Sequence, residues 1–171
     1  MMTKVRLFLF MSVLTVILFA GSCRKFEEYP LEPEIAFQDF GVFIDSVSGE
    51  PYGVLAVSYM DGDGDIGLEQ HDTLPPYQPG GEFYYNLIVL LFEQQYGEMI
   101  ESQADFSARI PPLIPKDETR SIKGVIEQII PLHDPNSTFD TIQFQVQLID
   151  RALNKSNILL TPLIIRPDIE P

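Results

Sequence analysis

The chain has 171 residues, of which 25 are acidic and 11 are basic, giving a formal net charge of −14. Such an acidic chain opposes binding to nucleic acids and to anionic membrane surfaces and favours cations or neutral ligands. We therefore expect no nucleic-acid partner. The single cysteine excludes an intramolecular disulfide, so the stability of the fold must come from its core.

Residues 1–22 have the pattern of a secretory signal peptide, with a basic start and an apolar run over 7–20. The run is shorter than the roughly 20 residues of a membrane span. Residues 19–23, FAGSC, resemble a bacterial lipobox, in which the cysteine becomes the lipid-modified first residue of the mature chain. We expect Cys23 to anchor the protein in the outer membrane. The alternatives are a secreted protein with one free thiol and an uncleaved helix.

Residues 23–33 are predicted to form the lipidated tether. Arg24 and Lys25 are followed, after one phenylalanine, by Glu27 and Glu28. This order resembles the export signal behind the lipidated cysteine of surface lipoproteins in Bacteroidota. An ordinary charged tether is the alternative, so the face of the outer membrane, including the cell surface, stays open.

The rest of the chain, 34–171, is predicted to be one all-β domain. Apolar residues alternate or run in short blocks rich in Val, Ile, Phe and Tyr, and no segment keeps a helical period. Turn-forming residues separate the blocks. The expected strands cover 34–44, 53–60, 83–93, 99–102, 121–132, 141–149 and 157–165.

About seven strands with turns between them favour an immunoglobulin-like two-sheet sandwich, and a β-barrel is the main rival. Residues 87–92, LIVLLF, are apolar on both faces and predict a central strand covered on each side. In such a sandwich the connections 61–82 and 150–156 lie at the same end. The first strand begins there too, which places this end near the tether.

The chemically distinctive stretch is DGDGDIG, residues 61–67. Asp61, Asp63 and Asp65 match the first, third and fifth positions of an EF-hand calcium loop. Ile66 stands where the EF-hand requires glycine for its sharp turn, and no helix flanks the stretch, so an EF-hand is excluded. Ile66 and Leu68 are expected to return the chain to the core.

A calcium site of another kind is one interpretation of this stretch, with Asp150 or Asn154 supplying further oxygens from the neighbouring connection. Three carboxylates repel one another, and a cation would relieve that repulsion. The alternative is a plain turn in which glycine supplies positive φ and aspartate bonds its own backbone. The sequence leaves both open.

Three segments together resemble a group of uncharacterised Bacteroidota lipoproteins. They are YPLEPEIAF at 29–37, MDGDGDIGL at 60–68, and IDRALNKSN at 149–157 followed by Thr161 and Pro162. The third segment also resembles a hairpin that closes many bacterial immunoglobulin-like modules. The resemblance implies a lipoprotein with this fold and implies no activity.

No nucleophile elbow and no phosphate-binding loop are present, and the acidic residues single out no catalytic pair. Thr73 lies in a sequence similar to the O-glycosylation motif of exported Bacteroidota proteins. The leading hypothesis is a non-enzymatic envelope lipoprotein that binds a protein or glycan partner or serves in assembly. The alternative is a glycan-handling accessory protein or a metal-dependent enzyme that uses the acidic loop, 61–72.

Overall fold

A computed structural model describes residues 29–167, which form an all-β domain without a helix. Among these residues, accordingly, no helix is long and apolar enough to cross a membrane. The eight strands are β1 (Glu34–Ile44), β2 (Pro51–Asp61), β3 (Leu87–Gln95), β4 (Glu98–Asp105), β5 (Ile122–Pro131), β6 (Thr141–Leu148), β7 (Leu159–Leu160) and β8 (Ile164–Ile165).

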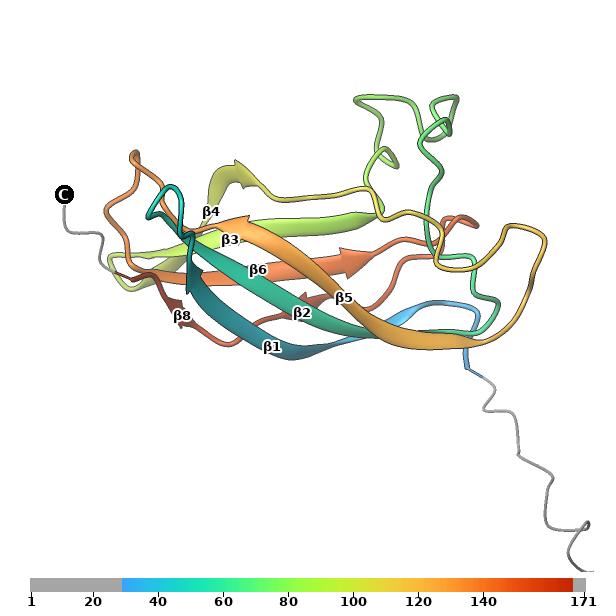
Figure 1. Ribbon diagram of the computed structural model, residues 1–171, viewed down its shortest axis with the longest axis horizontal. Helices are drawn as coiled ribbons and strands as arrows, with labels where there is room; N and C mark the ends of the chain where they lie inside the picture. Colours follow the sequence, from blue (N-terminus) through green and yellow to red (C-terminus); the bar gives the residue numbers. More distant parts are fainter. Residues whose placement is uncertain (1–28, 168–171) are drawn as a thin grey trace, which may run out of the picture.

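The strands form two antiparallel sheets that face one another (Figure 1). The first sheet has the order β1-β2-β5. The second has the order β4-β3-β6-β7, and β8 also pairs with β6. This two-layer arrangement confirms the expected all-β class and is that of a β-sandwich.

The core lies between the sheets and follows from the alternation of apolar residues. On β6, Ile142, Phe144 and Val146 are fully buried, whereas the glutamines between them are half-buried on the other face. The Phe144 ring stacks on Phe40 of β1, with ring centroids 5.7 Å apart, and so joins the two layers. Full burial of such a side chain contributes roughly 1.5–3 kcal/mol.

The expected strand over 83–93 begins later, at Leu87. Its neighbour Asn86 uses its side chain to bond both the backbone N–H and the carbonyl of Ile110. Side-chain hydrogen bonds of this kind compete with the backbone bonds of a sheet, so the regular strand begins only after Asn86. β3 is central, as expected, but only one of its faces is buried and the other is half-exposed.

The expected strand over 157–165 is instead two short strands, β7 and β8. Between them, Pro162 lacks an N–H and cannot donate to a sheet ladder. The hydroxyl of Thr161 accepts the N–H of Phe144, so a side chain takes the place of a backbone acceptor there. The chain therefore leaves the regular ladder for a few residues and then rejoins β6.

The connections 62–86 and 150–156 lie at one end of the sandwich, as expected (Figure 1). The longer one, in green, projects from the sheets. Residues 29–33, which the sequence assigns to the tether, lie against the domain at this same end.

Candidate metal centre

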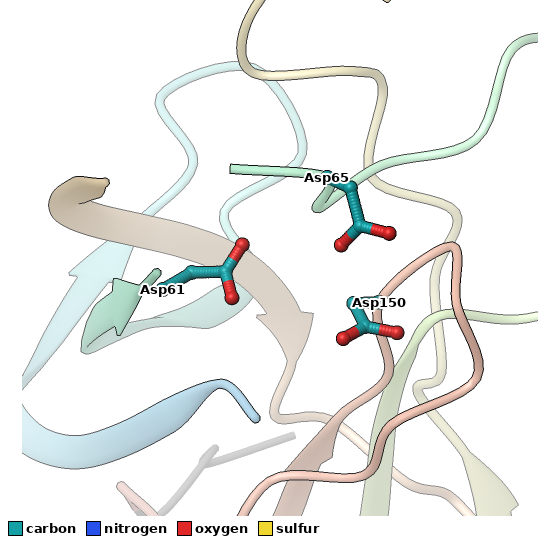
Figure 2. Close-up of side chains that lie close together, drawn as sticks. All are labelled: Asp61, Asp65 and Asp150. Carbon is teal, nitrogen blue, oxygen red and sulfur yellow. The ribbon is translucent and has the colours of Figure 1, made fainter. Parts of the chain in front are cut away.

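Three aspartates from separate segments converge at this end of the sandwich. Asp61 is the last residue of β2, Asp65 lies in the following loop, and Asp150 follows β6 at the start of a hairpin. One carboxylate oxygen from each lies within 4.8 Å of the others. Figure 2 shows the three side chains close together, with the carboxylates of Asp61 and Asp65 pointing into the space between the residues.

The loop after β2 is held in place by its apolar residues. Ile66 is fully buried and Leu68 nearly so, which confirms that this part of the chain returns to the core. Between them, Gly67 has a φ of 115°, a conformation that side-chain-bearing residues rarely adopt. A side chain at Gly67 would also collide with the backbone of Pro111 and Pro112, so glycine lets the loop pack closely against that segment.

The hairpin 150–156 fixes the third carboxylate. One oxygen of Asp150 accepts the backbone N–H of Asn154 at 2.7 Å, and its other oxygen accepts the Asn154 side-chain amide, also at 2.7 Å. Asn154 thus orients Asp150 by donating to it. Asn154 presents N–H groups to Asp150, whereas a metal ligand would need to present an oxygen.

The loop and the hairpin are also bonded to each other. The backbone N–H of Arg151 donates to the carbonyl of Asp65 at 3.2 Å, and that of Ala152 donates to one Asp65 carboxylate oxygen at 2.9 Å. The Arg151 guanidinium donates to the Gly67 carbonyl at 3.0 Å. Arg151 therefore supports the loop and does not pair with the aspartates.

Several carboxylate oxygens in the cluster are buried without a hydrogen bond from any described residue. They are both oxygens of Asp61, one of Asp63 and one of Asp65. The Gly64 amide near Asp61 partly counteracts the rise in its pKa but does not reach hydrogen-bonding geometry with either oxygen. Within residues 29–167, no lysine, arginine or histidine forms an ion pair with these aspartates.

The environment disfavours the charged form of these acids. Burial, reinforced by the charges of Asp63, Asp65 and Asp150, raises the pKa of Asp61 to about 7. Burial and the charge of Asp150 raise the pKa of Asp65 to about 6. Burial also raises the pKa of Asp150, against the bonds from Asn154. Buried carboxylates are tolerated when they are paired or coordinate a metal, and among the described residues no basic side chain pairs with these three.

The dimensions of the cluster suit calcium. Calcium binds oxygens at 2.3–2.6 Å, so ligand oxygens on opposite sides of the ion are roughly 5 Å apart. The three carboxylate oxygens lie within 4.8 Å of one another, so a single calcium ion could contact all three.

The structure groups Asp61, Asp65 and Asp150 among the predicted ligands. Asp63 lies at the margin, with one buried oxygen, and Asn154 stands behind Asp150. The sequence indicated the cluster but not the backbone amides of the hairpin, because an amide carries no signal in a sequence.

The two predicted modification sites have different positions. Thr73 lies on the projecting connection and is exposed, as an acceptor for a glycan must be. Cys23, the predicted lipidation site, lies outside the described residues.

No protein-family model, curated protein or solved structure matches this chain.

Proposed function

We propose that this protein is a calcium-binding β-sandwich in which the ion has a structural role. A single observation carries the proposal: the Asp61 carboxylate is fully buried, lacks a hydrogen-bond partner among the described residues, and faces two further carboxylates. A buried charge without a partner is strongly destabilising. A divalent cation supplies the missing partner and brings the acids together.

A structural ion fits the enclosure better than a catalytic one. Asp61 and Asp150 are 0% and 2% exposed. A catalytic metal needs an open coordination position that a substrate can reach, as zinc enzymes illustrate. Calcium that joins a strand end, a loop and a hairpin would instead stabilise this end of the sandwich.

The metal proposal is tested by calorimetry on protein stripped of calcium with a chelator. Titration with calcium chloride should release the heat of one site per chain, and the melting temperature should rise, because a ligand that binds only the folded state stabilises it by about 2.7 kcal/mol at one hundred times its dissociation constant. Asp61→Asn keeps the shape of the side chain and removes its charge, so this variant should lose both effects.

Asp117→Asn is the matched control, because Asp117 is an exposed aspartate outside the cluster. It should bind calcium as the unmodified chain does. Absence of heat and of a melting shift at millimolar calcium would refute the metal proposal and leave the turn interpretation.

We further propose that the domain is a non-enzymatic lipoprotein of the outer membrane, attached through Cys23 and serving in binding or assembly. The basic, apolar and lipobox-like segments of residues 1–23 support the attachment. An immunoglobulin-like fold and membership of the Bacteroidota lipoprotein group belong to the same proposal. The sheet orders β1-β2-β5 and β4-β3-β6-β7 support that fold.

The anchor is tested by metabolic labelling with palmitate. The full chain should incorporate the label and remain with the membrane fraction. Cys23→Ala should lose the label, because no other cysteine can replace it. Unchanged labelling of this variant would show that the lipid is not on Cys23.

A further inference from the structure

The N-terminal segment of the described chain crosses directly beside the acidic cluster. Gly62 follows Asp61, and a Cβ atom placed on Gly62 would come closer than 3.0 Å to the carbonyl oxygens of both Tyr29 and Pro30. Only glycine permits the two backbones to approach so closely. The segment is therefore in contact with the strand end that carries Asp61.

The same segment is bonded to the hairpin side of the cluster a few residues later. The side-chain oxygen of Asn157 accepts the N–H of Ile35 at 2.9 Å, and its side-chain amide donates to the carbonyl of Ile35 at 2.9 Å. Asn157 directly follows Ser156, whose backbone N–H and hydroxyl bond to Leu148 at the end of β6. Residues 29–35 thus contact both the β2 side and the hairpin side of the cluster.

We propose that the cation in the acidic cluster clamps residues 29–35 onto the domain. This inference rests on the proposed calcium site. Without a cation, Asp61 and Asp150 repel one another across the centre, and the two sides that hold the segment are driven apart. With a cation, both carboxylates are drawn to one ion, and the Gly62 and Asn157 contacts are held at their closed spacing.

The clamp would determine where the predicted tether joins the domain. Residues 29–33 are the part of the predicted tether that the structure describes, and they lie between Cys23 and β1 in the sequence. A bound ion fixes the point at which the tether leaves the domain, whereas loss of the ion lets that point move away from Cys23 toward β1 and lengthens the free linker.

Hydrogen exchange with mass spectrometry tests the clamp on the full chain, with calcium chloride as the probe. If residues 29–35 can open only after the ion leaves, exchange of the Ile35 amide slows by the factor one plus the ratio of free calcium to its dissociation constant. At ten times that constant we expect about a tenfold slowing over 29–37. Peptides from β4, an edge strand of the other sheet, should slow less than about twofold.

Two variants separate the clamp from the site itself. Asn157→Ala removes the bonds to Ile35 and none to the aspartates, so calcium heat should persist while the protection of Ile35 is lost. Asp61→Asn should lose both. Asn136→Ala, an exposed asparagine outside the cluster, is the matched control and should keep both.

The outcomes distinguish the two proposals. Calcium heat without slower exchange at 29–37 would overturn the clamp and leave the calcium site standing. Absence of calcium heat would overturn the site and the clamp together. Slower exchange in Asp61→Asn on adding calcium would also overturn the clamp, because protection would not depend on the cluster.

Discussion

At the scale of the residue, Asp61 is the least expected group in the protein. It occupies the end of a strand, is fully buried and accepts no hydrogen bond from residues 29–167, although Asp65 and Asp150 each accept one from the hairpin. Burial without a donor disfavours the carboxylate form, and this is the main reason that its pKa rises. Under the calcium proposal, Asp61 would destabilise the ion-free protein and would be a ligand in the calcium-bound one.

The calcium-free protein should therefore lose stability as the pH rises. The pKa of Asp61 is about 7 in the folded chain against 3.8 ordinarily, so between these values the folded state holds a proton that the unfolded state has released. That advantage is lost as the pH passes through 7. Urea unfolding in chelator should show Asp61→Asn gaining free energy of unfolding relative to the unmodified chain between pH 5 and pH 8, by up to about 3 kcal/mol.

Calcium should reverse this trend, because the ion stabilises the charged form. With calcium present, the unmodified chain should be more stable at pH 8 than at pH 5. A difference between the two proteins that does not change with pH would show that Asp61 titrates normally. Asp117→Asn again serves as the control for the loss of a surface charge.

At the scale of the element, the backbone N–H groups of β5 fall into two sets. One set bonds the neighbouring strand β2, and the other faces the free edge of the sheet. The N–H of Leu132, just past the strand, donates to the carbonyl of Pro51. Amides on alternate residues of an antiparallel strand face the same way, so the N–H of Gln128 also faces β2 and that of Glu127 faces the free edge. Pro131 belongs to the free-edge set, where its missing N–H removes no ladder bond.

Proline substitutions at two adjacent positions test this assignment. Gln128→Pro removes a bond to β2 and leaves a carbonyl of that strand without a donor, whereas Glu127→Pro removes none. Both impose the same restriction on φ. We expect Gln128→Pro to lower the free energy of unfolding in urea by roughly 1–3 kcal/mol more than Glu127→Pro. Equal losses, or a larger loss for Glu127→Pro, would contradict the orientation of the strand.

At the scale of the whole molecule, two places with buried acids differ in whether a described basic side chain pairs with the acid. At the end of the second sheet opposite the cluster, Glu93 of β3 pairs with Arg166 at 2.9 Å, and both side chains are nearly buried. The fold can therefore supply its own cation to a buried acid. Beside the acidic cluster, the guanidinium of Arg151 bonds the backbone carbonyl of Gly67 and forms no ion pair with the described aspartates. This contrast favours an external cation there.

Much of the fold could be predicted from local pattern. The alternation of Ile142, Phe144 and Val146 against glutamines fixes a strand with one buried face, and these three residues are indeed fully buried. The ends of the strands were predicted less accurately than their interiors. There, the side chains of Asn86 and Thr161 form hydrogen bonds with segments distant in the sequence, in place of backbone bonds between strands.

The sequence by itself determined the all-β class, the acidic loop and the expectation that this loop meets the hairpin after β6. Only the tertiary structure decided that Asp61 has no hydrogen-bond partner among the described residues, that Asn154 supports Asp150, and that Tyr29 and Pro30 lie against Gly62. The physical reason is the range of the interactions. Alternation and turn formation depend on neighbouring residues, whereas burial, pKa and close backbone approach depend on segments that are distant in the sequence and meet only when both sheets are packed.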